Sequence, residues 1–496
     1  MKQKELEEYI LKAANTLREM AEAADVKRFI FPLLFYKRLS DVWDEEYEEA
    51  LELYDNDIEA AKLLENYRFQ IPDGCHWSDI RSTSTDIGSK IQKSLREIEN
   101  ANFERLNGVF GDAQWTNKRI LSDAKLIDLV EQLSGTTLSK ENISDDSMGA
   151  GFEFLVKDFA QDTGHTAADF YTNRTVIDLV LKLADPQPGE SIYDPACGSG
   201  GFLLKTALYL KNKGKEYRNL KLFGQELKVF TTSVARINMF MHGIDEFTLT
   251  SGNTIDKPQI LEHDEIKQFD VVMSNPEFTV TNWSQAQFTN DPYGRNTLGT
   301  PPQGNADYAF QQHILKSLNH RGGRSVTVLP HGVLFRDAEQ EMRQNMIKQD
   351  LVEAVIGLGK NLFFGSSMEC CLIVCRKNKP SDRKGKVLFI DAKNEIRLER
   401  SEAYLKKEHI EKIDSTYKDG LEQDGFSKII SNEDILGTHN GNLSIQLYVK
   451  NITDIDEQSV EDVLNESVKS QRIIQSNFFN LLNELKNIGI ETDETK

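Results

Sequence analysis

Two short segments of this chain carry residues suited to binding a nucleotide and acting on a base. Residues 194–202 read DPACGSGGF, and residues 275–278 read NPEF after a run of apolar residues. Glycine lets a backbone turn tightly and approach a ligand, and the amide groups at the start of a helix face that ligand. The first segment therefore predicts a loop for a dinucleotide or S-adenosylmethionine, although a tight strand-to-helix turn would use the same residues.

Segment 275–278 predicts chemistry at an exocyclic amino group. The amine of adenine is a poor nucleophile because its lone pair is delocalised into the ring. The side-chain oxygen of Asn275 and the carbonyl of Pro276 both accept hydrogen bonds, so together they can hold the two N–H groups and favour a pyramidal, reactive nitrogen. Phe278 is suited to stacking on a flipped-out base, a contact worth about 1–3 kcal/mol. The alternative is a strand-terminating turn followed by a core phenylalanine.

Two further residues and one segment extend the predicted cofactor site. Glu226 ends the strand after the glycine loop, where acids in nucleotide-binding α/β folds accept from ribose hydroxyls. Asn253 follows the third strand and can accept from the adenine amine of the cofactor, while residues 169–174 precede a helix and are expected to close over its methionine end. A surface carboxylate, a turn asparagine and a helix cap are the respective alternatives. The predicted cofactor-binding residues are Asp169, Phe170, Tyr171, Thr172, Asn173, Arg174, Asp194, Gly198, Ser199, Gly200, Gly201, Glu226 and Asn253.

The elements that must position these residues read as an α/β fold. From about residue 151, short apolar runs alternate with helical segments, which is typical of a doubly wound, mainly parallel sheet. The strands are expected at 191–193, 221–225, 247–251, 270–274, 325–329, 351–358, 370–375 and 387–390. Helices fit at 202–211, 229–242, 306–318 and 338–348.

The flanking regions have a different pattern. Apolar residues at helical spacing predict helices within 5–54, with Pro32 near the start of the second, and at 85–100 and 121–134. Segment 279–305 lacks a clear period, and a loop of that length is usually functional or mobile. The expected domains are therefore a helical domain at 1–145, an α/β catalytic domain at 146–400, and a polar region at 401–496 that contains a partner-binding helix at 460–485.

Composition limits the partners and the cellular setting. The formal charge of −20 is unfavourable for gripping DNA, because phosphate binding is dominated by lysine and arginine. Either the substrate is not nucleic acid, or a more basic partner supplies most of the phosphate contacts. The five cysteines and nine histidines show no metal-binding spacing, so no metal is predicted. No leader or membrane-spanning stretch is expected, which makes the cytoplasm the default location.

These segments resemble the modification (M) subunit of type I restriction-modification systems, an N6-adenine DNA methyltransferase. The similarity runs over nearly all of residues 5–450. It is carried by segments 31–42, 170–172, 194–202, 224–226, 306–310, 328–335, 355–365 and 442–445.

The resemblance implies a set of partners. Two M subunits would assemble with one specificity (S) subunit that reads double-stranded DNA, and restriction (R) subunits would join for cleavage. The N-terminal helices would clamp around DNA, and the C-terminal helix would dock on the S subunit. This arrangement accounts for the acidic composition, since much of the phosphate contact can lie on the S subunit.

Three residues depart from the family pattern. Glu277 and Asn173 stand where proline is usual, and Asn253 stands where an acid is usual. Asn253 still accepts a hydrogen bond, only without charge assistance. With Asn275, Pro276 and Phe278 retained as catalytic residues, methyl transfer is favoured over a catalytically silent assembly subunit that still binds cofactor. A nicotinamide-dependent oxidoreductase would leave segment 275–278 and the helical N-terminal region unexplained.

Overall fold

The fold is described from a computed structural model of the chain. Its described residues are 1–18, 23–162, 172–363, 368–399 and 402–450, with the single residues 468 and 471. They belong to one compact unit at 1–449 and to a second unit at 450–496. None of the described helices is long and apolar enough to span a membrane.

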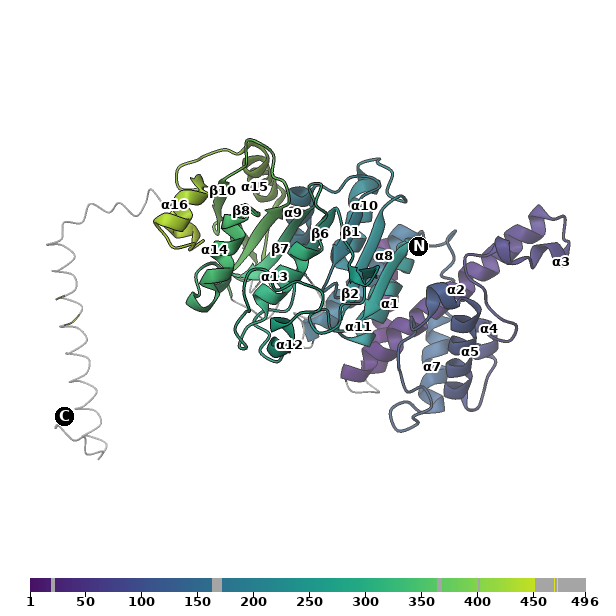
Figure 1. Cartoon of the computed structure of the whole chain (residues 1–496). Coiled ribbons are helices and arrows are strands. Elements are labelled where there is room, and N and C mark those ends of the chain that lie inside the picture. The colour runs from purple at the N-terminus through teal and green to yellow at the C-terminus, as the bar shows by residue number, and fades with distance from the viewer. Residues whose placement is uncertain are drawn as a thin grey trace, which may run out of the picture. The chain divides into compact units, whose positions relative to one another are not determined.

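A mixed sheet forms the centre of the first unit (Figure 1). Among the described residues it has nine strands in the order β13-β10-β8-β9-β7-β6-β1-β2-β3. Their bounds are β1 Ser191–Asp194, β2 Lys221–Glu226, β3 Phe247–Ser251, β6 Val271–Ser274, β7 Arg324–Pro330, β8 Val352–Leu358, β9 Cys370–Arg376, β10 Lys386–Ala392 and β13 Ser427–Ser431. The short hairpins β4 (Leu261–Glu262) with β5 (Glu265–Ile266) and β11 (Arg397–Glu399) with β12 (Glu402–Tyr404) stand apart from it.

Strand order reverses beside β1. The chain proceeds from β1 to β2 and β3 on one side, and then returns to place β6 and β7 on the other. Strand β1 pairs in parallel with both neighbours, with Ile192 opposite Leu222 of β2 and opposite Val271 of β6. Ligands of open α/β sheets bind at the carboxyl ends of strands at such a reversal. The glycine loop after β1 and segment 275–278 after β6 both lie there.

Helices cover both faces of the sheet, which is why the central strands are apolar on both sides. One core includes residues of α9 (Arg174–Ala184), α10 (Gly201–Asn212) and α15 (Lys407–Asp419). The opposite core includes residues of α13 (Asp307–Lys316), α14 (Gln340–Lys348) and α16 (Asn432–Gly437). The expected doubly wound fold is confirmed.

The N-terminal helices form a third core together with one helix of the α/β region. Helices α1 (Gln3–Arg18), α2 (Ala23–Leu53), α5 (Ile87–Ala101), α7 (Asp123–Leu133) and α8 (Asp145–Asp162) share it with α11 (Val229–Met241). The rings of Phe35 and Phe240 stack across this contact at 5.8 Å. The helical region is therefore packed onto the α/β core, and the expected boundary near residue 145 stays a prediction.

The remaining helical segments of this region are short. They are α3 Ile58–Ala61, η1 Leu64–Asn66, α4 Trp77–Arg81 and α6 Phe103–Leu106.

The sheet is mainly parallel, as expected, although β9 runs antiparallel to β7 and β8 and β13 runs antiparallel to β10. Two local expectations differ from the structure. Pro32 lies inside α2, which begins at Ala23, so it is not near the helix start. The region after residue 400 supplies α15, β13 and α16 to the folded core, whereas the expected helix at 460–485 lies outside the described residues apart from two single positions.

Segment 279–305 is packed against the core rather than structureless. It contains α12 (Gln285–Thr289), and Trp283 and Phe288 join Ile255 and Ala309 in a small apolar cluster. Arg295 is 2% exposed and forms an ion pair with Asp291 at 2.7 Å. The same guanidinium donates to the carbonyls of Thr254 and Ile255, which joins this segment to the turn after β3.

The α/β region also contains short helices in its connections. These are η3 His331–Leu334, η4 Asp337–Glu339 and η5 Ile445–Leu447.

Packing between α8 and α11 requires a glycine. A Cβ added to Gly149 would lie 2.3 Å from ring carbons of His242, which is itself 5% exposed. We expect Gly149→Ala to destabilise the fold by about 1–3 kcal/mol through overpacking. Thermal unfolding followed by circular dichroism measures the change. Gly437→Ala in α16, where nothing lies within 4 Å, is the control and should melt like the unmodified protein; equal melting of both variants would contradict this packing.

Candidate active site

The glycine loop leaves β1 and turns directly into α10. Gly198 and Gly200 have φ of +53° and +82°, a region that favours glycine, and Gly200 is the N-cap of the helix. The Cys197 N–H donates to the carbonyl of Gln225 at 3.0 Å, which fastens the loop to β2. The first turn of α10 thus faces the crevice between β1 and β6.

A buried hydrogen bond joins the glycine loop to the strand that carries Asn275. The Ser274 hydroxyl donates to Asp194 Oδ1 at 2.8 Å, and the Ala196 N–H donates to the same oxygen at 3.0 Å. Both Asp194 and Ser274 are almost fully buried. Burial, assisted by the nearby charge of Glu226, raises the pKa of Asp194 to about 7, although the two hydrogen bonds act in the opposite direction.

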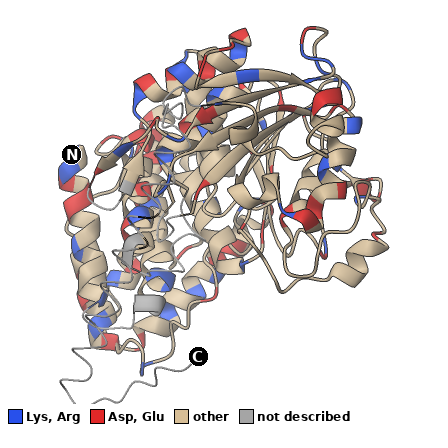
Figure 2. Ribbon diagram, turned by 90° about the vertical axis from the view of Figure 1, so that its left-hand side faces the viewer, with Lys and Arg blue, Asp and Glu red and all other residues tan. Residues whose placement is uncertain are grey.

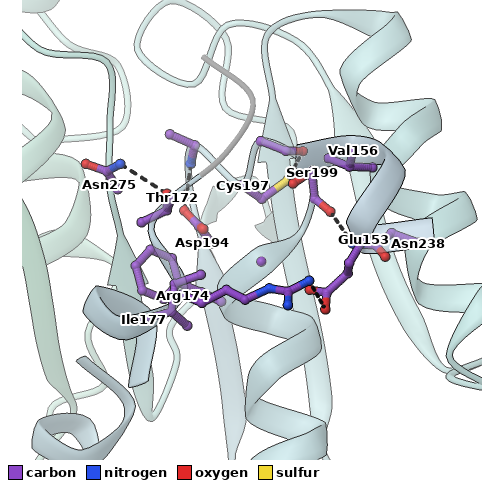
Figure 3. A pocket seen from close by; sticks show the side chains of 14 residues that line it. Glu153, Val156, Thr172, Arg174, Ile177, Asp194, Cys197, Ser199, Asn238 and Asn275 are labelled. Atoms are coloured by element: carbon purple, nitrogen blue, oxygen red, sulfur yellow. Dashed lines mark hydrogen bonds and ion pairs between the residues drawn. The ribbon is translucent and has the colours of Figure 1, made fainter. Parts of the chain in front are cut away.

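Asn275 follows β6 at the rim of the crevice. Its side-chain nitrogen donates to Thr172 Oγ1 at 3.1 Å. Its side-chain oxygen is buried and has no hydrogen-bond partner among the described residues. Figure 3 shows the nitrogen directed at Thr172 and the oxygen directed to the other side. An unpartnered buried acceptor is costly, so the oxygen is available to a donor brought by a ligand.

Two hydrogen bonds hold the backbone after Phe278. Thr279 has φ of +54°, which is strained for a β-branched residue, and its N–H donates to Asp307 Oδ1 at 3.0 Å. The Ala306 N–H donates to the carbonyl of Val280 at 3.1 Å. Asp307 is 1% exposed and its other oxygen accepts from Arg336 at 2.7 Å.

The ring of Phe278 is half-buried between these fixed points. It packs edge-on against Phe363, with ring centroids 5.9 Å apart. The orientation of Phe278 is therefore determined by Asp307 on one side and by Phe363 on the other.

A hollow lies between the glycine loop, Asn275 and α8 (Figure 3). Seven of the predicted site residues line it: Thr172, Arg174, Asp194, Gly198, Ser199, Gly201 and Asn275. Residues separated by about a hundred positions are thus brought around one space. The other lining residues are Glu153, Val156, Ile177, Ala196, Cys197, Phe202 and Asn238.

Other predicted residues lie elsewhere. Glu226 is at the end of β2, where its Oε2 accepts from the Gly198 N–H at 3.2 Å. It touches the glycine loop without lining the hollow, at the position expected for a ribose-binding acid. Pro276 is buried just behind Asn275, and Gly200 supports the loop from the helix start. Asp169, Phe170 and Tyr171 lie outside the described residues.

Two predicted cofactor residues are engaged in local structure. Asn173 caps α9, because its side-chain oxygen accepts from the Thr175 N–H at 3.0 Å. The side-chain oxygen of Asn253 accepts from the N–H groups of Ile255 and Asp256, at 2.9 and 3.1 Å, as in an ordinary asparagine turn. Both arrangements match the alternatives that the sequence left open, and the cofactor roles of these two residues stay predictions.

Sequence reasoning missed Glu153 and Asn238. Glu153 lies in α8 and forms ion pairs with Arg174 at 3.0 Å and with Lys205 at 2.9 Å. Burial alone would raise the pKa of Glu153, but Lys205, Arg174 and His242 together lower it, so the carboxylate is charged. Its signal in the sequence is an acid within the apolar run of residues 152–156, whereas Asn238 has no comparable signal.

Family comparisons agree with this geometry. The N-6 DNA Methylase family model matches residues 143–457, and the HsdM N-terminal domain model matches residues 6–133. The type I restriction enzyme MpnII methylase subunit of Mycoplasma pneumoniae is 27% identical, over 97% of this chain and 96% of its own length. The MjaVIII methylase subunit of Methanocaldococcus jannaschii is 30% identical, over 84% of this chain and 70% of its own length.

Solved structures extend the comparison to the fold. The type I restriction-modification system methyltransferase subunit from Streptococcus thermophilus superposes with a TM-score of 0.75 at 26% identity. The match covers 91% of this chain and 100% of that one. A modification subunit of a putative type I restriction enzyme from Vibrio vulnificus has the same fold, with a TM-score of 0.63 at 17% identity and coverage of 93% and 98%. The chain belongs to the N-6 DNA methylase family, the adenine-specific DNA methyltransferases that use S-adenosylmethionine.

Proposed function

We propose that this chain is the modification subunit of a type I restriction-modification complex and transfers a methyl group from S-adenosylmethionine to adenine N6 in double-stranded DNA. The observation that carries the proposal is the buried side-chain oxygen of Asn275, beside the glycine loop, which has no hydrogen-bond partner in the described part of the chain. An acceptor in that position suits a substrate amine. The names of the similar methylase subunits support the same interpretation.

The residues of the hollow fit the cofactor. Gly198 and Gly200 keep Cβ atoms away from the loop, and the first turn of α10 presents amide groups. Glu226 lies at the loop's edge for a ribose, and Arg174 and Glu153 offer opposite charges at the far end of the hollow. When bound, S-adenosylmethionine supplies an electrophilic methyl group on a sulfonium.

The residues after β6 act on the base. The Asn275 side-chain oxygen and the Pro276 carbonyl accept from the two N–H groups of adenine N6, which directs the nitrogen lone pair toward the hollow. Proline at 276 restricts Asn275 to an extended backbone and so fixes the direction of its side chain. Phe278 stacks on the extruded ring and offsets part of the cost of flipping, by about 1–3 kcal/mol.

Charge supports a role for partners in DNA binding. Figure 2 shows Lys and Arg interspersed with Asp and Glu along the outer helices, without a continuous basic face in that view. With a net charge of −20, the chain is poorly suited to grip a duplex by itself. An S subunit would supply the target reading and much of the phosphate contact. A second M subunit would complete a complex of two M subunits with one S subunit, and R subunits would add cleavage.

Substitution of Asn275 tests the catalytic assignment. We expect Asn275→Ala to lower methylation by at least about 100-fold in the reconstituted complex, because a positioned acceptor is lost. Asn275→Asp keeps an acceptor and should retain measurable activity. Calorimetry with S-adenosylmethionine should give near-normal affinity for both variants. Full activity of Asn275→Ala would refute the role, and an inactive unmodified complex would favour a silent assembly subunit.

The raised pKa of Asp194 predicts a pH-dependent cofactor affinity. Ionisation of this buried carboxyl occurs near pH 7, so raising the pH from 6 to 7.5 adds a negative charge beside the hollow. Cationic S-adenosylmethionine should then bind more tightly, by several-fold and at most about tenfold. Calorimetry across this pH range should show a smaller change in affinity for neutral S-adenosylhomocysteine. In Asp194→Asn, the affinity for S-adenosylmethionine should depend less on pH. The same slope in Asp194→Asn would contradict the assignment.

Asp307 is expected to position Phe278. Asp307→Ala removes the acceptor of the strained Thr279 N–H, so Phe278 should lose its fixed orientation. Fluorescence of 2-aminopurine at the target adenine should then show reduced flipping, with a raised KM for DNA and unchanged cofactor affinity. Asp337→Ala, an exposed acid on η4, is the matched control. Unaltered flipping in Asp307→Ala would contradict this role.

A further inference from the structure

The far end of the hollow from Asn275 presents two hydrogen-bond acceptors from different helices. Glu153 of α8 and Asn238 of α11 both line it (Figure 3). Among the described residues, Arg174 and Lys205 form ion pairs with Oε2 of Glu153, the His242 ring lies 4.0 Å from the same oxygen, and no bond is found on Oε1. One oxygen of a charged, buried carboxylate is therefore open toward the hollow.

Asn238 contributes the second acceptor. The residue is 2% exposed, and its side-chain nitrogen donates to the Ser199 carbonyl at 3.0 Å. That bond fixes the amide orientation, because a flipped amide would set two oxygens against each other. Its Oδ1 is buried without a partner among the described residues, which is unfavourable unless a ligand donates to it.

A donor for carboxylates lies next to these acceptors. Arg174 uses one terminal nitrogen on Glu153, while its Nε is buried without a partner in the described part of the chain. The first turn of α10 also borders the hollow, and a helix N-terminus favours negative charge. Acceptors for a cation beside donors for an anion match the two charges of an α-amino acid.

We propose that Glu153 and Asn238 bind the α-ammonium group of the cofactor's amino-acid end, and that Arg174 and the start of α10 bind its carboxylate. This inference rests on the proposed function, since it assigns one end of the same hollow. The ammonium has three N–H donors and one positive charge, which satisfy Oδ1 of Asn238 and Oε1 of Glu153 together.

One consequence concerns the helical N-terminal region. Helix α8, which carries Glu153, also packs against α1 and α11 in the N-terminal core. The cofactor would therefore contact α8 in addition to the strands and loops that form the rest of its site. Through Glu153, bound cofactor would therefore be in contact with the helices of the first 160 residues.

Truncation of the ligand tests the proposal. Calorimetry of the full chain compares S-adenosylhomocysteine with 5′-methylthioadenosine, which keeps the adenosine and the sulfur but lacks the amino-acid end. We expect Glu153→Gln and Asn238→Ala to weaken S-adenosylhomocysteine by about 10- to 100-fold, the loss of a charge-assisted hydrogen bond. The affinity for 5′-methylthioadenosine should change by less than about twofold on the same reasoning.

A substitution elsewhere on α8 serves as the control. Asp158→Asn lies on the same helix and breaks an ion pair with Arg18 at 2.6 Å without lining the hollow, so it should leave both affinities unchanged. If the two ligands weaken equally in the Glu153 and Asn238 variants, or neither weakens, the assignment is overturned and both residues are only structural. If the unmodified chain binds neither ligand, the proposed function itself fails.

Discussion

The hydrogen bond from Ser274 to Asp194 is the contact on which the arrangement of the site depends. It joins the ends of β1 and β6, two strands that lie side by side because the chain reverses its strand order between them. Since both groups are buried, the bond cannot be replaced by water. It holds the glycine loop and Asn275 at a fixed separation, and this is the geometric requirement for transferring a group between two ligands.

The hollow beside this contact has polar side chains at both ends. Asn275 and Asn238 lie at opposite ends of the hollow, each has an amide oxygen that is buried without a partner among the described residues, and the loop after β1 lines the space between them. Buried acceptors in native proteins usually have a hydrogen-bond partner, so both oxygens are suited to donors that arrive with a ligand. An amine donor is therefore expected at both ends, one from the substrate base and one from the cofactor.

Much of the fold could be predicted from the sequence. Eight strands and the helices between them lie within two residues of their expected bounds, because buried strands and amphipathic helices have strong periodic signals. Strand β13 and the antiparallel direction of β9 were not predictable, since pairing depends on contacts between residues distant in sequence. Pro32 within α2 was misjudged because tertiary packing of the surrounding apolar residues overrides the local cost of proline.

The site was predicted best where residue type and backbone turn coincide, as at Asp194, Gly198 and Asn275. Glu153 and Asn238 were missed because each lies inside a helix whose pattern reads as core packing, and only the tertiary structure turns them toward the hollow.

The most direct test of the proposed mechanism is a structure of the assembled complex with sinefungin and a duplex containing the target adenine. We expect sinefungin in the hollow and adenine extruded beside it at Asn275, with N6 at about 2.7–3.2 Å from the Asn275 side-chain oxygen and from the Pro276 carbonyl. A base that stays stacked, or that enters with its amino group directed away from Asn275, would contradict the mechanism.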